Sequence, residues 1–144
     1  MLTMDRPPVV IDASAAIELV TRGLPGLEAT WSNWRASDRL QLVPAHFWAE
    51  AGHGLLRGRR LAVPEASARL DAIRETGIEV ADRGHDGLVD AVRLAASHGL
   101  SVYDALYLQL ALDVDGTLAT YDTALATAAE AEGVGLEDLG EPSG

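Results

Sequence analysis

The chain has 144 residues, no cysteine and a formal net charge of −11 from 22 acidic and 11 basic residues. This charge argues against a general affinity for nucleic acid, since phosphate contacts need a basic face. The lack of cysteine excludes disulfides and thiolate metal sites, and no apolar run approaches the roughly 18 residues of a membrane span. We expect a single cytoplasmic domain over residues 1–144 that makes no membrane contact, with loose termini at 1–8 and 140–144.

The first predicted element of the chain is a buried strand. The apolar, β-branched run Val9-Val10-Ile11 is typical of a strand covered on both faces, and it ends at Asp12. Helices are predicted over 14–20 and 27–36, and a short strand follows over 40–43. Trp31 and Trp34 lie one turn apart, which favours core or subunit packing over a nucleotide platform.

The alternation of helices and strands continues to the end of the chain. Glycine and proline residues separate the later segments and indicate approximately where each begins and ends. We predict helices over 45–56, 64–75, 86–97, 101–113 and 123–132, strands over 78–80 and 116–120, and a last short strand around 135–139. This alternation predicts an α/β fold, with a central parallel sheet between two layers of helices in a three-layer α/β/α sandwich.

Four acids stand at selected positions of this pattern. Asp12 and Asp122 each follow a predicted strand and precede a helix, which places both at the carboxyl edge of the sheet, where open α/β folds bind ligands. Asp104 begins the helix before the last of these strands and can reach the same edge. Glu50 lies inside a predicted helix whose neighbouring residues form no charged stripe.

Each acid also has a purely structural interpretation. Asp12, Asp122 or Ser14 could cap a helix, and Ser101 with Asp104 could form a capping box. Glu50 could lie on a solvated helix face. The ordered set is harder to explain in this way, because clustered carboxylates repel one another unless a cation binds them or their pKa values rise. Oxygen ligands without cysteine favour Mg²⁺ or Mn²⁺.

Four segments in this order resemble the PIN domain, and in particular the VapC toxins of bacterial toxin–antitoxin pairs. They are Val9-Val10-Ile11-Asp12-Ala13-Ser14, Pro44-Ala45-His46-Phe47-Trp48-Ala49-Glu50, Ser101-Val102-Tyr103-Asp104-Ala105-Leu106-Tyr107 and Leu118-Ala119-Thr120-Tyr121-Asp122. The resemblance extends from Asp12 to about Leu139.

The resemblance implies a Mg²⁺- or Mn²⁺-dependent endoribonuclease that cuts a phosphodiester in single-stranded or loop RNA. It also implies a cognate VapB-like antitoxin and a homodimer. By this similarity Asp12, Glu50, Asp104 and Asp122 would be the catalytic acids. Asp12 and Asp104 would hold the metal most directly, and the hydroxyls of Ser14 and Thr120 would support them.

Other polar residues are less specific. Arg57, Arg59 and Arg60 form the one dense basic patch, which could contact RNA, an acidic stretch of an antitoxin, or only solvent. The histidines at 46, 53, 85 and 98 have no metal-ligand spacing as a set. His46 and His53 are seven residues apart on the helix of Glu50, so a role at the site is an alternative to a structural one.

Two rival functions remain open. A phosphoacceptor signalling domain is also an acidic parallel α/β fold, but it needs a pair of acids near the first strand, and Asp12 has no acidic neighbour. A catalytically degenerate PIN-like module that binds RNA or protein without cutting would have the same fold. Such a module should bind Mn²⁺ weakly or not at all.

Overall fold

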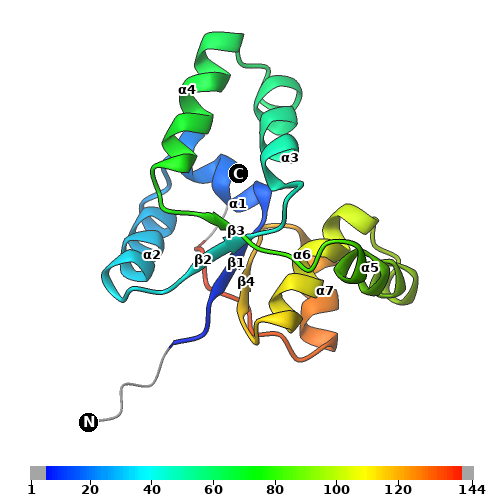
Figure 1. Ribbon diagram of the computed structural model, residues 1–144. Helices are drawn as coiled ribbons and strands as arrows, with labels where there is room; N and C mark the ends of the chain where they lie inside the picture. Colours follow the sequence, from blue (N-terminus) through cyan, green and yellow to red (C-terminus); the bar gives the residue numbers. More distant parts are fainter. Residues whose placement is uncertain (1–5, 141–144) are drawn as a thin grey trace.

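The short strand β1 (Val9–Ile11) lies inside a four-stranded sheet in the order β3-β2-β1-β4. All three strand pairings are parallel in the computed structural model, which describes residues 6–140. Every β1 residue is fully buried, as its β-branched sequence predicts for a strand covered on both faces. Figure 1 shows β1 at the centre of the molecule, leading directly into the first helix.

The remaining strands and helices follow in the predicted alternation. Most limits agree with the prediction to within one or two residues. The elements are α1 (Ala13–Thr21), α2 (Pro25–Ala36), β2 (Gln41–Val43), α3 (Phe47–His53), η1 (Gly54–Gly58), α4 (Val63–Arg74), β3 (Glu79–Val80), α5 (His85–His98), α6 (Val102–Asp113), β4 (Thr117–Ala119) and α7 (Thr123–Ala131).

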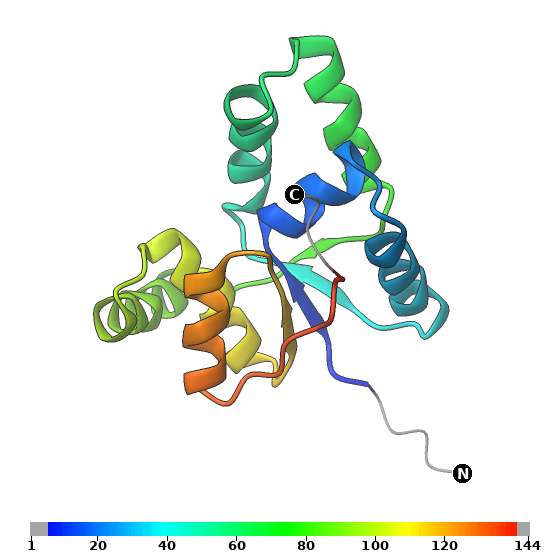
Figure 2. The same cartoon turned by 180° about the vertical axis from the view of Figure 1, so that it is seen from behind.

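The helices form a layer on each side of the sheet. Helices α1–α4 lie on one side and α5–α7 on the other in two opposite views (Figures 1 and 2). Right-handed crossovers explain this division, because the chain moves from β1 towards β3 and then returns past β1 to β4. The predicted three-layer α/β/α fold is therefore confirmed.

The tryptophan pair belongs to the core. Trp31 and Trp34 are both buried, with ring centroids 5.2 Å apart. The indole N–H of Trp31 donates to Gln41 Oε1 on β2 at 2.8 Å, so its one polar atom is satisfied inside the protein. The interpretation as packing is confirmed, and these rings fix α2 against the sheet.

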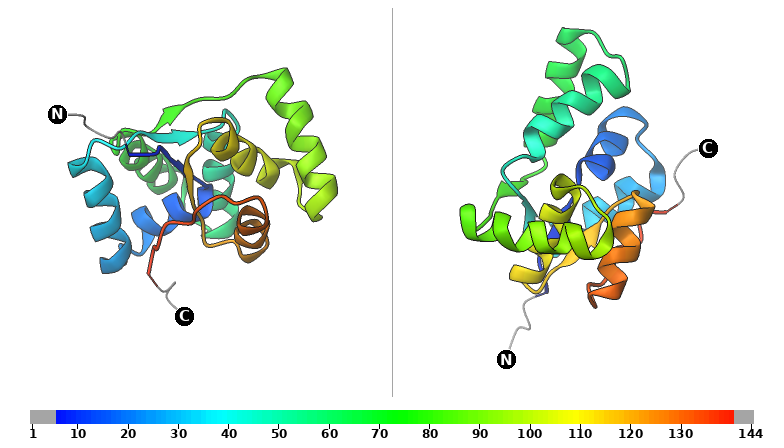
Figure 3. Two further views of the ribbon diagram at one scale, coloured as in Figure 1. Left: turned by 90° about the horizontal axis from the view of Figure 1, so that it is seen from below. Right: turned by 90° about the vertical axis from the view of Figure 1, so that its right-hand side faces the viewer.

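The predicted helix over 45–56 differs from the structure in one respect. It begins two residues later, and after His53 it widens into the π-helical turn η1, where the Arg59 N–H donates to the Gly54 carbonyl at 2.8 Å. Gly54 lies against Ile17 of α1 so closely that a Cβ would collide with its Cδ1. Helix α3 and its π-helical end pack beside α4, and Figure 3 shows this pair extending beyond the sheet.

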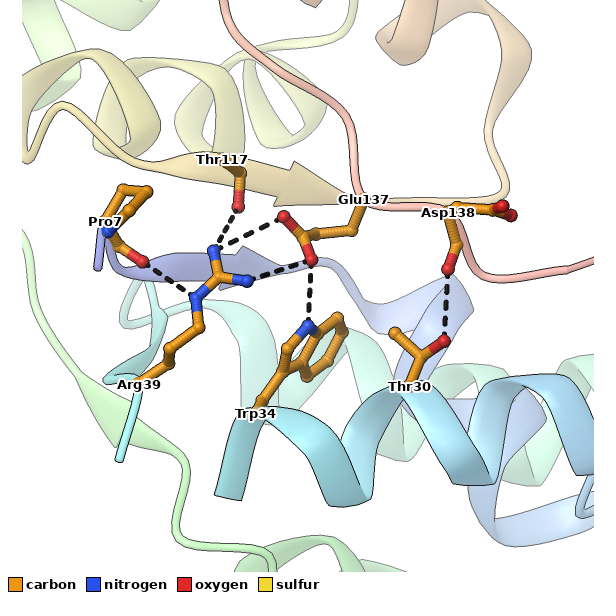
Figure 4. Close-up of polar contacts among 7 residues, drawn as sticks. All are labelled: Pro7, Thr30, Trp34, Arg39, Thr117, Glu137 and Asp138. Atoms are coloured by element: carbon orange, nitrogen blue, oxygen red, sulfur yellow. Dashed lines mark hydrogen bonds and ion pairs between the residues drawn. The ribbon is translucent and has the colours of Figure 1, made fainter. Parts of the chain in front are cut away.

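The C-terminal segment is bound to the sheet by one charged cluster. Arg39 donates to both Glu137 carboxylate oxygens, at 3.1 and 3.3 Å, and to the Pro7 carbonyl at 3.0 Å. Trp34 donates to the same carboxylate at 2.9 Å (Figure 4). Burial raises the pKa of Glu137, but these hydrogen bonds outweigh it and hold the pKa below its usual value. Leu136 forms a single parallel bridge with Leu118, where the last strand was predicted.

Two sequence-based expectations concern the chain ends and membranes. Residues 1–5 and 141–144, most of the termini expected to be loose, lie outside the described residues. Between residues 6 and 140, none of the helices has the length and apolar character needed to span a membrane.

Candidate functional site

Asp12 follows β1 and is held by three hydrogen bonds. Its Oδ1 accepts from the Ser14 hydroxyl at 2.6 Å and from the Ala15 N–H at 3.1 Å, and its Oδ2 accepts from the Thr120 hydroxyl. Asp12 therefore caps α1, as the structural interpretation proposed. A helix cap has no need of complete burial, however, and Asp12 is only 4% exposed.

The burial of Asp12 changes its acidity. Removal from water raises its pKa from the usual 3.8 to about 6; the three hydrogen bonds offset part of this effect, and the charge of Glu50 adds to it. A carboxylate in this state binds a cation more favourably than an exposed one, because the cation offsets a charge that water does not. Stability alone does not explain an acid kept in this position.

The ends of β1 and β4 are joined through the two hydroxyls. Thr120 donates to Asp12 and accepts from the Asp122 N–H at 2.9 Å, while Ser14 accepts from the Tyr121 N–H at 3.0 Å. Figure 2 shows both strands leading into their helices at the same edge of the sheet. Asp122 also caps α7, since its Oδ1 accepts from the Leu125 N–H at 2.8 Å.

Glu50 comes from the helix that follows β2, and a buried tyrosine orients it. The Tyr107 hydroxyl of α6 donates to Glu50 Oε1 at 2.7 Å. Burial and the adjacent Glu50 charge raise the pKa of Tyr107, so its hydroxyl stays protonated and remains a donor. Glu50 is half-buried, so it does not lie on a fully solvated helix face.

Asp104 lies in the first turn of α6. Its N–H donates to the Ser101 hydroxyl at 3.0 Å, which is one half of the capping box considered from sequence. Partial burial raises the pKa of the Asp104 carboxyl, and the charges of Asp122 and Glu50 raise it further. All four predicted acids are therefore coupled electrostatically, although they come from four different segments.

The carboxylates do not form a tight ligand cage. Within residues 6–140, no group of three or more histidine or acidic side chains is already arranged to hold a metal ion. A Mg²⁺ ion does not require such a cage, because it keeps several waters and is bound by one or two carboxylates together with substrate phosphates. Four coupled oxygen donors, two of them with raised pKa values, fit such an ion.

Sequence reasoning missed an aromatic group beside the acids. The His46 ring lies between Tyr103 and Tyr107, with centroid distances of 5.9 and 4.9 Å. Both ring nitrogens of His46 are buried and have no hydrogen-bond partner in the described part of the chain. Tyr103 and Tyr107 flank Asp104 in the quoted motif, but no periodicity shows that a histidine from another segment lies between their rings.

The basic patch is only partly available to a ligand. Arg59 donates to Glu18 Oε1 at 2.5 Å, so it binds η1 to α1 within the chain. Arg57 and Arg60 are exposed on the same turn. A contact between the patch and RNA or an antitoxin would therefore depend on these two residues.

Comparisons of the sequence with known protein families and proteins agree with one another. The sequence profile of the PIN domain matches residues 9–131. Over 85 residues the chain is 39% identical to Ribonuclease VapC3 of Pyrobaculum aerophilum, an alignment that covers 58% of this chain. The chain spans only 61% of the length of that relative.

Two crystal structures share the fold. PAE2754 of Pyrobaculum aerophilum superposes with a TM-score of 0.67 at 23% identity, covering 90% of this chain and 89% of that one. VapC20 of Mycobacterium tuberculosis, described as a toxin that cleaves the sarcin-ricin loop, has a TM-score of 0.64 at 20% identity. The match covers 83% of this chain and 94% of VapC20, and at these identities it concerns the fold alone.

Proposed function

The chain belongs to the PIN domain family, and on that premise we propose that it is a Mg²⁺- or Mn²⁺-dependent endoribonuclease, the toxin of a VapBC-type toxin–antitoxin pair. The observation that carries this proposal is the placement of four acids from separate segments, in which the charge of Glu50 raises the pKa of Asp12 and the charges of Asp122 and Glu50 raise the pKa of Asp104. The similarity to Ribonuclease VapC3 supports RNA as the substrate.

The acids have different roles in this proposal. Asp12 is the fixed ligand, because Ser14, Ala15 and Thr120 hold both of its oxygens in place. Asp104 is the more accessible ligand at the start of α6. When bound, a divalent cation lowers the pKa of a water molecule and stabilises the charge that develops on the phosphodiester.

Glu50 and Asp122 complete the site. Tyr107 orients Glu50 through its hydroxyl, so that one carboxylate oxygen is fixed and the group can position water or a metal-bound ligand. Asp122 uses Oδ1 to cap α7, which fixes the direction of its side chain towards the edge that Asp104 shares. Both groups act on the cation and the water.

RNA cleavage tests this proposal directly. Purified protein is incubated with total RNA in Mg²⁺ or in EDTA, and the new RNA ends are mapped. We expect discrete cuts that need Mg²⁺ and disappear in Asp104→Asn. The matched control is Asp86→Asn, which changes an exposed aspartate in the first turn of α5 and should leave the cuts unchanged. Persistence of the cuts in Asp104→Asn would refute the proposed site, whereas RNA binding without cleavage would favour the degenerate module.

A protein partner is the second part of the proposal. Leu88, Val89 and Val92 of α5 are exposed apolar side chains on one helix, a surface that a VapB-like antitoxin or a second copy of the chain would cover. Expression in a bacterial host should inhibit growth, and co-expression of the neighbouring open reading frame should relieve it. Growth inhibition that the neighbour does not relieve would contradict the toxin–antitoxin assignment.

A further inference from the structure

Tyr103 exposes an aromatic ring next to the acids. It precedes Asp104 in the first turn of α6, and 64% of its surface is open to solvent. Helix propensity does not require an aromatic residue here, and the core does not need this ring. A large exposed aromatic side chain beside a proposed catalytic group is a candidate for ligand contact.

The ring is supported from below. Tyr103 rests on His46 with the ring planes tilted by 41°, and His46 rests on Tyr107 with a tilt of 59°. The Tyr107 hydroxyl bonds to Glu50, which connects the three rings to one of the acids. The outermost ring is therefore held in place by packed neighbours, although its outer side is free.

Two of these rings, Tyr103 and His46, border a cavity that also includes an acid. Its volume is about 410 Å³, within the range of small-molecule sites, and it is lined by His46, Ala49, Glu50, His53 and Tyr103. Its walls are mostly apolar or aromatic, with Glu50 as the acidic group. This composition suits a flat, uncharged and polar-edged ligand group such as a nucleobase.

We propose that Tyr103, supported by His46, is the platform on which an unpaired base of the substrate RNA stacks next to the scissile phosphate. The proposal rests on the proposed ribonuclease function and specifies how that site selects single-stranded RNA. Stacking does not depend on charge, so it provides affinity where a chain of net charge −11 cannot rely on phosphate contacts. A base in a duplex is stacked on its neighbours and cannot occupy this cavity.

A protein contact is the competing explanation for the exposed ring. The position favours RNA, because Tyr103 lines the same cavity as Glu50 and is adjacent to Asp104. The exposed apolar side chains Leu88, Val89 and Val92 lie on a different helix and provide a separate surface for a protein. Tyr103 therefore positions a base of the RNA within the site.

The fluorescence of a base analogue in a short RNA measures the proposed stacking directly. A short uridine oligonucleotide with one central 2-aminopurine is mixed with protein in Mg²⁺, and fluorescence is read at mixing, since stacking on a ring quenches this base. We expect quenching with the wild type and with Tyr103→Phe. Tyr103→Ala should lose the quenching and bind the oligonucleotide roughly 5- to 150-fold more weakly, the range for removal of one base–aromatic stack.

Two controls separate stacking from simple apolar contact. Tyr103→Leu keeps an apolar side chain without a π-face and should lose the quenching, whereas Val63→Ala, at an equally exposed apolar position on α4, should change nothing. Equal quenching by the wild type, Tyr103→Ala and Tyr103→Leu would overturn the proposal. So would an unchanged RNA signal in Tyr103→Ala together with altered sedimentation, since the ring would then belong to a protein contact.

Cleavage of an unlabelled RNA is measured in parallel. Quenching without any cleavage would support the platform and count against the proposed ribonuclease. Cleavage by the wild type without quenching would leave the ribonuclease standing and overturn only the platform.

Discussion

At Asp12, the proposed metal site needs a buried carboxylate, whereas the stability of the fold is lowered by burying one. Its carboxyl is buried beneath the ends of β1 and β4, and burial raises its pKa from the usual 3.8 to about 6. The folded protein therefore binds a proton more tightly than the unfolded chain does between about pH 4 and pH 6. Without a cation, stability should fall as the pH rises through this window.

Asp12→Asn should consequently stabilise the metal-free protein at neutral pH. The shift corresponds to about 3 kcal/mol of unfolding free energy at pH 7.5, at 1.36 kcal/mol for each pKa unit, and the gain should vanish below pH 4. The asparagine oxygen can still accept from Ser14, and its amide can donate to Thr120. Urea unfolding in EDTA at several pH values measures the difference. A variant that is less stable than the wild type at pH 7.5 would contradict this account.

Tyr107 provides a second prediction at the level of single residues. Tyr107→Phe removes the hydroxyl that donates to Glu50 Oε1 but keeps the ring packed against His46. We expect kcat for RNA cleavage to fall roughly 10- to 150-fold while KM changes little, because a hydrogen bond to a charged group contributes roughly 1.5–3 kcal/mol. Steady-state kinetics on a short RNA provides the measurement.

Tyr121→Phe is the matched control for this substitution. The Tyr121 hydroxyl donates to the Leu139 carbonyl at 3.2 Å, away from the acids. Its loss should leave kcat unchanged. Equal decreases in both variants would mean that a general loss of packing, and not the orientation of Glu50, explains the result.

At the level of elements, the positions of the strands determine which acids meet. Thr117 pairs with Val9, and its N–H donates to the Pro8 carbonyl at 2.9 Å, which sets the register of β4 against β1. This register brings Thr120 beside Asp12. This register requires glycine at position 116, because a Cβ there would lie 2.6 Å from the Pro8 carbonyl oxygen.

Gly116→Ala should therefore destabilise the protein. The colliding atom belongs to the backbone and cannot rotate away, so β4 would have to shift against β1, at a cost of about 1–3 kcal/mol by analogy with overpacking. Gly52→Ala is the control. A Cβ at Gly52, where α3 continues into η1, would meet only Leu70 Cδ1 at 3.9 Å, so this substitution should be neutral or stabilising. In thermal unfolding, only Gly116→Ala should lower the midpoint, and equal midpoints in the two variants would show that the close approach contributes nothing to stability.

Sequence patterns predicted the elements well because each has a local signal. The β-branched run at β1, the glycines after helices and the prolines before them mark limits that tertiary contacts did not override. The π-helical turn η1 has no such signal, because it arises where Gly54 lets α1 approach. The same holds for the Arg39–Glu137 cluster, whose members are 98 residues apart.

The candidate site follows from similar local signals, and the roles of its residues stay a prediction. Its four acids could be chosen because three of them lie next to predicted strand or helix limits and one stands in an unexpectedly apolar helix. Their dual use as helix caps was also foreseen for Asp12 and Asp122. The Tyr103–His46–Tyr107 stack was not, because ring contacts between α6 and the segment before α3 depend on packing that no single segment encodes.

For the whole molecule, the net charge of −11 is the main difficulty for the proposed action on RNA. Repulsion between the acidic edge and a phosphodiester must be offset before the two can meet. A bound divalent cation reduces the negative charge at the edge itself, and base stacking adds affinity without charge. We therefore predict that the protein itself binds the cation before the substrate arrives.

Calorimetric titration of Mn²⁺ into the metal-free protein at pH 7.5 tests this claim most directly. We expect saturable binding to the wild type and to the control Asp86→Asn, and at least tenfold weaker binding to Asp104→Asn. Binding to the wild type should weaken as the pH is lowered through about 6, where Asp12 becomes protonated. An absence of binding to the wild type, or equal affinity in Asp104→Asn, would contradict the account.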